Sequence, residues 1–234
     1  MNLNLPKDFD DYGFLGIQAE EFSRDILKKY KEWFGYCYEL NSFCQRVKFE
    51  IEIHNRDGQE VISCCLFLKI LNGFQACLIL SRYGLVLEAE VLVRSILEAL
   101  FIMRACIDDE EFMRDYVNSD KLRQLNIMKA AHRHTEWIFE ATREAATKER
   151  IDRLTEMKKG GEIKKLEIRE IARKAGLEPL YDSAYSLLSD SVHSGPKSVD
   201  VYLGTDGRGY IRRISMIPEK IEMEIVFVTA IQTV

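Results

Sequence analysis

Residues 82–107 read RYGLVLEAEVLVRSILEALFIMRACI, and this stretch decides the fold. It is almost entirely apolar from Leu85 onward, yet Glu90, Arg94 and Glu98 recur at every fourth residue. An α-helix has about 3.6 residues per turn, so these three charged side chains share one face. We therefore expect a core helix with a polar row, and we expect other parts of the chain to partner that row.

The polar row has two interpretations. An arginine with carboxylates four residues before and after it can be satisfied within its own helix, which would make the row an ion-pair network that fixes helix docking. Alternatively, the row belongs to a pocket in which Arg94 receives an anion and Glu90 or Glu98 acts as a base or ligand. The sequence leaves both interpretations open.

The preceding segment, residues 61–81, reads VISCCLFLKILNGFQACLILS and is equally apolar. About 20 apolar residues are enough to cross a membrane, so a membrane span is an alternative. Lys69 lies within this segment, however, and ionised groups are costly in the centre of a bilayer. We expect an all-α helical bundle around two central apolar helices at residues 60–82 and 85–107, with no membrane contact.

The chain is expected to form a single helical domain over residues 1–234. An irregular lead-in covers residues 1–16. A helical pattern then runs from Ile17 to about Ile53, and Gly35 is expected to loosen it.

The second half of the chain is also mainly helical in its pattern. Asp108 and Asp109 can cap a helix that runs with few breaks from Glu110 to about Met157. The other predicted elements are a projecting helical arm at 140–176, a helix at 178–193, a β-hairpin at 199–216 and a final helix from Pro218 to Val234.

The net charge of −5 argues against a dedicated nucleic-acid binder, because phosphate binding needs clustered cations. Residues 143–174 are the local exception, with eleven Lys or Arg against seven Asp or Glu. We interpret this segment as a solvated, salt-bridged arm in preference to an RNA or DNA contact. Residues 1–14 lack a basic segment followed by an apolar run, so a cytoplasmic protein is expected.

A second candidate site lies at residues 186–195, which read SLLSDSVHSG. Ser189 and His193 share a polar stripe with Asp182 and Ser186, beside an apolar stripe of the same helix. His193 is expected at the C-terminus of that helix, where the helix dipole favours its cationic form. The histidine either caps a solvated helix or lines a site together with the neighbouring serines.

No metal or cofactor is expected. His132 and His134 are two residues apart on a predicted helix and point in different directions, and His132 with Glu136 supplies only two ligands. The six cysteines lack Cys-x-x-Cys pairs and are expected to be buried free thiols. Glycine-rich phosphate loops and the H-E-x-x-H and G-x-S-x-G patterns are absent, as is the Arg-to-His spacing of HEPN-type helical ribonucleases.

Several short motifs resemble a known family. Residues 84–89, GLVLEA, run into residues 92–99, LVRSILEA, and Tyr185, Leu188, Ser189, Val192 and His193 recur later. In these motifs the chain resembles a bacterial family catalogued only as domain of unknown function 5677, over roughly residues 60–200. The resemblance implies a helical bundle without an assigned reaction, in which Arg94, Glu98 and His193 match the family's polar pattern. It also implies that the two stretches face each other.

The leading functional prediction is a cytoplasmic, non-enzymatic helical module that binds a small ligand or a protein partner, in stress or defence. Its predicted ligand-binding residues are Glu90, Arg94, Ser189 and His193. The alternative is a hydrolase or nuclease in which Arg94 binds an anion, Glu98 or Glu90 acts as the base or ligand, and His193 acts as acid or base. A homo-oligomer is left open.

Overall fold

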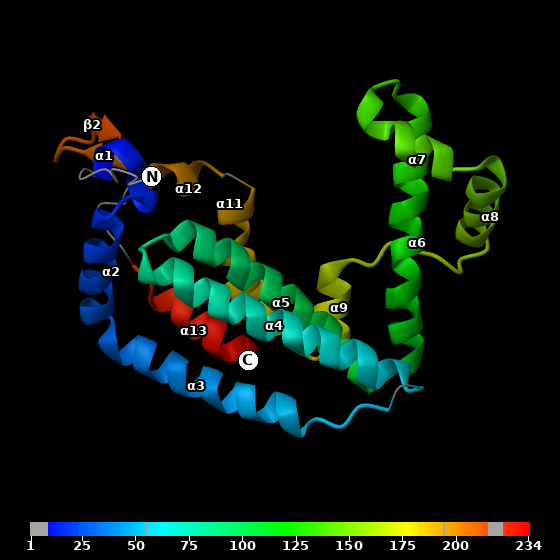
Figure 1. Cartoon of the computed structure of the whole chain (residues 1–234), viewed down its shortest axis with the longest axis horizontal. Helices are drawn as coiled ribbons and strands as arrows, with labels where there is room; N and C mark the ends of the chain where they lie inside the picture. The colour runs from blue at the N-terminus through cyan, green and yellow to red at the C-terminus, as the bar shows by residue number, and fades with distance from the viewer. Residues whose placement is uncertain (1–8, 55, 194, 215–221) are drawn as a thin grey trace, which may run out of the picture. The chain divides into compact units, whose positions relative to one another are not determined.

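The computed structural model describes residues 9–54, 56–193, 195–214 and 222–234. These residues are mostly α-helical, with a short antiparallel hairpin near the C-terminus, which confirms the predicted all-α class (Figure 1). Two compact units are present, one formed by residues 1–52, 65–100 and 179–234 and the other by residues 53–64 and 101–178. The single domain over residues 1–234 stays a prediction.

The two central helices lie where the sequence predicted them. Helix α4 spans Gly58–Arg82 and helix α5 spans Val86–Asp108. Gly84 separates them in a left-handed conformation with φ 72°, which glycine adopts without steric cost. A Cβ at Gly73 of α4 would overlap with Cγ2 of Ile96 of α5, so this glycine permits close packing of the two helices.

The N-terminal helices differ from the predicted pattern at two places. Residues 9–15 form α1 (Phe9–Tyr12) and the 3-10 helix η1 (Gly13–Leu15) where an irregular lead-in was predicted. Helices α2 (Gln18–Lys29) and α3 (Lys31–Glu50) are separated at Tyr30. The backbone dihedrals of this residue, φ −108° and ψ 29°, are not helical. The predicted weak point at Gly35 is therefore wrong, since this glycine lies inside a continuous helix.

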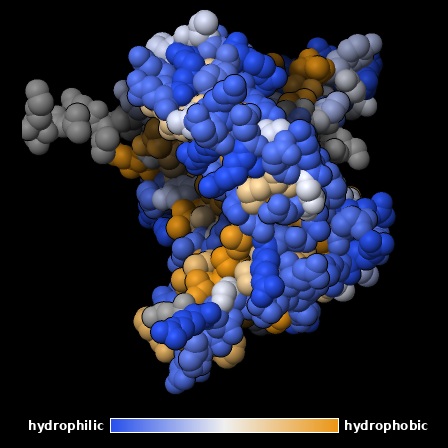
Figure 2. Space-filling model, turned by 90° about the vertical axis from the view of Figure 1, so that its right-hand side faces the viewer, coloured by the Kyte–Doolittle hydropathy of each residue, from blue (hydrophilic) through white to orange (hydrophobic). Residues whose placement is uncertain are grey.

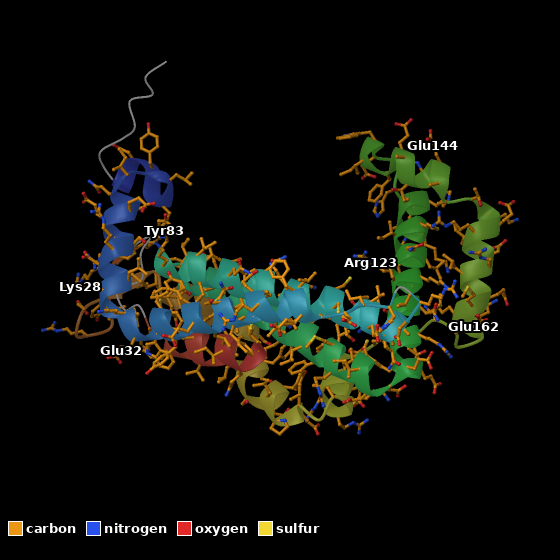
Figure 3. The ribbon with its side chains drawn as sticks, turned by 60° about the horizontal axis from the view of Figure 1, so that its bottom comes forward. Lys28, Glu32, Tyr83, Arg123, Glu144 and Glu162 are labelled. Carbon is orange, nitrogen blue, oxygen red and sulfur yellow. The ribbon has the colours of Figure 1, made fainter. Side chains whose placement is uncertain are left out.

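Helix α2 is attached to the end of α4 by two polar contacts. Arg82 Nε donates to Ser23 Oγ at 2.9 Å. The hydroxyl of Tyr83, a residue labelled in Figure 3, donates to Glu20 Oε1. Both contacts lie beside the Gly84 turn, so they fix the corner from which α5 begins.

The last helix, α13 (Glu224–Thr233), packs on α3 through aromatic rings. The ring of Phe227 lies edge-on to Phe34 at 5.0 Å between centroids and stacks with Trp33 at 5.9 Å. Phe34 and Phe227 are buried and form part of the core of the first unit. The predicted start of this helix, Pro218, lies outside the described residues.

The segment before the hairpin is helical but broken. It comprises α10 (Glu178–Leu180), the π-helix η3 (Tyr181–Tyr185), α11 (Ser189–Val192) and α12 (Pro196–Asp200). Strands β1 (Leu203–Thr205) and β2 (Ile211–Ile214) then pair antiparallel.

The hairpin prediction is confirmed, but the predicted start at Val199 is wrong. Val199 belongs to α12, because Pro196 supplies the fixed φ of a first helical position and Ser198 donates its hydroxyl to the Gly195 carbonyl. The predicted end at Met216 lies outside the described part of the chain.

The second unit contains α6 (Glu110–Arg133), η2 (Trp137–Phe139), α7 (Glu140–Ala145), α8 (Lys148–Lys159) and α9 (Ile168–Lys174). Asp109 caps α6 as predicted, because its side chain accepts from the Phe112 amide at 3.0 Å. The side of the molecule that carries α8 in Figure 1 is largely hydrophilic on its surface (Figure 2).

The prediction of one helix with few breaks from Glu110 to about Met157 is wrong, since α6 ends at Arg133 and three separate helices follow up to Lys159. The chain turns, and α8 packs against α6 in a small core made of Leu125, Met128, Ala146 and Leu154. Burial of Leu154 against α6 favours the turn over continuation as a solvated helix. Residues 140–159 thus cover α6, and their projection from the rest of the chain stays a prediction.

Helix α4 is the one helix in the described ranges that is long and apolar enough to cross a membrane, with a mean hydropathy of 1.8 in its most apolar window. Core helices of soluble proteins meet the same criterion. Its residues Ile70, Phe74 and Cys77 are buried inside the first unit.

Candidate functional site

The polar row of α5 faces the segment that contains the π-helix and α11. Arg94 is 16% exposed and Glu98 is 38% exposed at the side chain, so the row is partly buried. Arg94 Nη1 lies 3.5 Å from Glu98 Oε1, which is the intrahelical ion pair that the spacing predicted.

Tyr185 connects these two charged groups. Its hydroxyl accepts a hydrogen bond from Arg94 Nη2 at 2.7 Å and donates one to Glu98 Oε1 at 2.7 Å. The guanidinium carbon of Arg94 also lies 4.4 Å from the centroid of the Tyr185 ring. We call Arg94, Glu98 and Tyr185 the arginine network.

Tyr185 is only 4% exposed. Burial raises the pKa of its hydroxyl well above the ordinary value, and the hydrogen bond to Glu98 raises it further. The hydroxyl therefore remains protonated and acts as a donor to Glu98 at neutral pH.

The π-helix determines which residues of this segment face α5. Tyr181 and Tyr185 stack at 4.8 Å between ring centroids within it. A π turn contains an extra residue relative to an α turn, and such turns occur frequently at functional sites. The sequence pattern placed Tyr185 in an apolar stripe and missed its polar role. The residue type could have indicated this role, because a tyrosine hydroxyl that is buried generally needs a hydrogen-bond partner.

Glu90 has a separate partner. Ser191 donates its hydroxyl to Glu90 Oε2. Burial raises the pKa of Glu90, the Ser191 hydrogen bond lowers it, and the neighbouring charge of Glu88 raises it again. The net direction is upward, so Glu90 holds a proton more tightly than an exposed glutamate does.

The two predicted stretches therefore lie face to face, but through Tyr185 and Ser191. Ser189 donates its hydroxyl to the Tyr185 carbonyl at 3.0 Å, within its own segment. His193 is exposed, and its imidazole makes no hydrogen bond or ion pair with any residue that the structure describes. The ligand-binding roles of Ser189 and His193, and the alternative hydrolase that needs His193, stay predictions.

One donor of the arginine network is unsatisfied. The Nε of Arg94 is buried and has no hydrogen-bond acceptor within the described part of the chain. A buried donor without an acceptor costs about 1–3 kcal/mol, and more when it is charged. Such a group in a folded protein calls for an explanation, for example a water, an ion or a ligand. The arginine network thus keeps one donor without an acceptor among the described residues.

No group of three or more His, Cys, Asp or Glu able to hold a metal ion occurs among the residues described. His132 Nε2 lies 2.8 Å from the Ala146 carbonyl, and the His134 ring stacks on Phe139. The cysteines Cys37, Cys44, Cys77 and Cys106 are buried free thiols, whereas Cys65 is exposed. Burial raises the pKa of Cys37 to about 11 and that of Cys77 to about 12, which keeps both thiols protonated.

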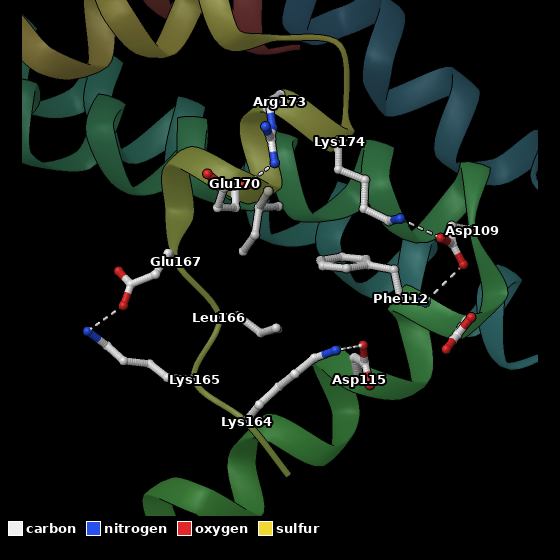
Figure 4. A pocket seen from close by; sticks show the side chains of 12 residues that line it. Asp109, Phe112, Asp115, Lys164, Lys165, Leu166, Glu167, Glu170, Arg173 and Lys174 are labelled. Atoms are coloured by element: carbon white, nitrogen blue, oxygen red, sulfur yellow. Dashed lines mark hydrogen bonds and ion pairs between the residues drawn. The ribbon is translucent and has the colours of Figure 1, made fainter. Parts of the chain in front are cut away.

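The second unit carries a hollow of about 700 Å³ between α6 and the segment 164–174 (Figure 4). Its cations are paired: Lys164 with Asp115 at 2.6 Å, Lys165 with Glu167 at 2.7 Å, Lys174 with Asp109 at 2.5 Å, and Arg173 with Glu170. The Lys174 ammonium and the Phe112 amide hold the pKa of Asp109 below its usual range. Each lysine and arginine that lines this hollow is thus paired with a carboxylate, and the solvated, salt-bridged arm stays a prediction.

Fold and site together define a helical protein in which a partly buried polar row on α5 contacts the segment that contains Tyr185 and Ser191. The model of a family described as "Family of unknown function (DUF5677)" matches residues 60–210, more than half of the chain. The chain belongs to this family, which confirms the resemblance seen in the sequence. No curated protein and no solved structure matches the chain.

Proposed function

We propose that this protein is a non-enzymatic binding module whose arginine network receives a small ligand or a partner segment through an acceptor oxygen. The observation that supports the proposal is the buried Nε of Arg94, which has no acceptor among the described residues. The other guanidinium donors are engaged by Tyr185 and Glu98, so the site is already ordered before binding.

The ligand should carry an oxyanion or carbonyl oxygen, because a guanidinium Nε–H donates to such groups with good geometry. Glu90 and Glu98 add negative charge close by, which favours a ligand that also carries a donor. A non-enzymatic role is preferred because the acid or base of the alternative hydrolase, His193, is exposed and makes no contact with Arg94 or Glu98. Cytoplasmic location and a role in stress or defence remain part of the proposal.

A thermal-melt screen of metal ions, nucleotides and RNA tests the proposal, since a ligand that binds the native state raises the melting temperature. The matched variant is Arg94→Lys, which keeps a positive charge but lacks the Nε donor. We expect at least one oxyanion-bearing compound to raise the melting temperature of the wild type and to leave that of Arg94→Lys unchanged. Equal shifts for both proteins, or no shift with any compound, would contradict the proposal.

A further inference from the structure

A second hollow, of about 510 Å³, lies on the second unit between α6 and α8. It is lined by Lys129, His132 and Arg133 of α6 and by Lys148 and Ile151 of α8. Its size is within the usual range for small-molecule sites, about 300–1,000 Å³.

The three cations of this hollow differ from those of the 700 Å³ hollow. Their charged groups make no ion pair or hydrogen bond with any residue of the described ranges. In the larger hollow every lining lysine and arginine is paired with a carboxylate. The chain therefore does not neutralise the cationic residues that line the smaller hollow, whose own surface is mostly apolar.

Helix electrostatics account for only part of this arrangement. Lys129 and Arg133 lie in the last two turns of α6, where cations are favoured by the helix dipole. Lys148 is the first residue of α8, where the same dipole disfavours a cation and where anions are bound. The cation at this position thus adds to the positive end of α8.

The floor of the hollow is apolar and fixed. Ile151 packs against the small core of Leu125, Met128, Ala146 and Leu154. His132 is held at 2.8 Å from the Ala146 carbonyl, so its ring is positioned as part of the wall. The hollow consequently joins an apolar base to a cationic rim.

We propose that this hollow binds a small organic anion, in which a sulfonate, phosphate or carboxylate group is attached to an apolar body. The acidic group contacts Lys129, Arg133 and Lys148, and the apolar body lies on Ile151 and the His132 ring. This site is independent of the arginine network, which belongs to the other unit.

The fluorescent probe 8-anilinonaphthalene-1-sulfonate has the required chemistry and tests the proposal by titration. The triple variant Lys129→Gln, Arg133→Gln, Lys148→Gln should weaken binding about tenfold, since each exposed charge pair contributes modestly and the effects add. The matched control is Arg153→Gln, Lys158→Gln, Lys159→Gln, which removes the same charge from α8 outside the hollow. The control should change the Kd less than about twofold. Equal weakening by both variants would overturn the proposal.

Two further readouts locate the probe. Amine labelling followed by mass spectrometry should show that the probe protects Lys129 and Lys148 but not Lys158. Inorganic sulfate at the same concentration should not displace the probe, because it lacks the apolar body. Unprotected Lys129 and Lys148 in the presence of bound probe, or displacement by sulfate alone, would each contradict an amphipathic site.

Discussion

Tyr185 donates its buried hydroxyl to Glu98 across 2.7 Å and thereby joins the π-helix to α5. The same hydroxyl accepts from Arg94, so a single oxygen satisfies groups of opposite charge on one helix. This contact connects segments that are 87 residues apart in the sequence, and it orders the site proposed to bind a ligand.

Removal of this hydroxyl should destabilise the first unit. Tyr185→Phe leaves the ring in place but deprives Arg94 Nη2 and Glu98 of their shared partner. We expect a loss of about 1–2 kcal/mol in the free energy of unfolding, measured in urea with Trp33 fluorescence as the probe. Tyr36→Phe is the control, because Tyr36 is 63% exposed. Equal stability of both variants and the wild type would show that the bridge contributes nothing.

The two helical glycines Gly73 and Gly35 should respond in opposite directions to alanine. Gly73→Ala places a methyl group on the buried side chain of Ile96, and overpacking of this kind costs about 1–3 kcal/mol. Gly35→Ala meets open space within α3 and should stabilise by about 0.5–1 kcal/mol through helix propensity. Denaturant unfolding of the pair measures both values. Stabilisation by Gly73→Ala would contradict the close approach of α4 and α5.

Stability should depend on pH through Glu90, whose pKa is raised mainly by burial. A carboxyl group with a raised folded-state pKa contributes stability that is fully present below its unfolded pKa, about 4.3, and lost as the pH rises through the folded pKa. The free energy of unfolding of the wild type minus that of Glu90→Gln should therefore be larger at pH 4 than at pH 7. The exposed Glu144, changed to Gln, should give no such trend. A difference that increases with pH would refute the burial of Glu90.

The loop after α6 should depend on Arg143. Its Nη1 donates to the His134 carbonyl at 2.6 Å and to the Ala131 and Glu136 carbonyls at 3.4 Å. Arg143→Gln should accelerate amide hydrogen exchange in residues 134–139 by about tenfold, because charge-assisted hydrogen bonds are lost. Arg153→Gln is the control. Unchanged exchange in this loop would mean that the contacts of Arg143 do not order it.

The sequence was sufficient to predict the two central helices to within two residues. Their long apolar runs permit no other element, and Gly84 separates them. The end of α6 was not predictable in the same way. Leu154 looks like an isolated apolar residue in a charged helix, and its burial depends on Leu125, which is distant in the sequence.

The polar row of α5 contacts the segment that the sequence proposed as its partner, but through Tyr185 and Ser191, and the roles of Ser189 and His193 stay predictions. Periodicity at 3.6 residues assigned Ser189 and His193 to the facing stripe. The π-helix at Tyr181–Tyr185 and the break before α11 change the register, so Tyr185 and Ser191 face α5. A π turn is rare and occurs mostly as a single turn inside an α-helix, so a uniform period of 3.6 residues does not predict it.

The most direct measurement of the central claim is the NMR resonance of the Arg94 Nε–H group, assigned by its loss in Arg94→Lys. Titration with acetate and with phosphate supplies a generic acceptor oxygen. The proposal predicts a saturable downfield shift of the Arg94 Hε proton, larger than that of the exposed Arg123, because a free donor gains an acceptor. An Arg94 resonance that stays unchanged while those of exposed arginines shift would contradict a binding role for the arginine network.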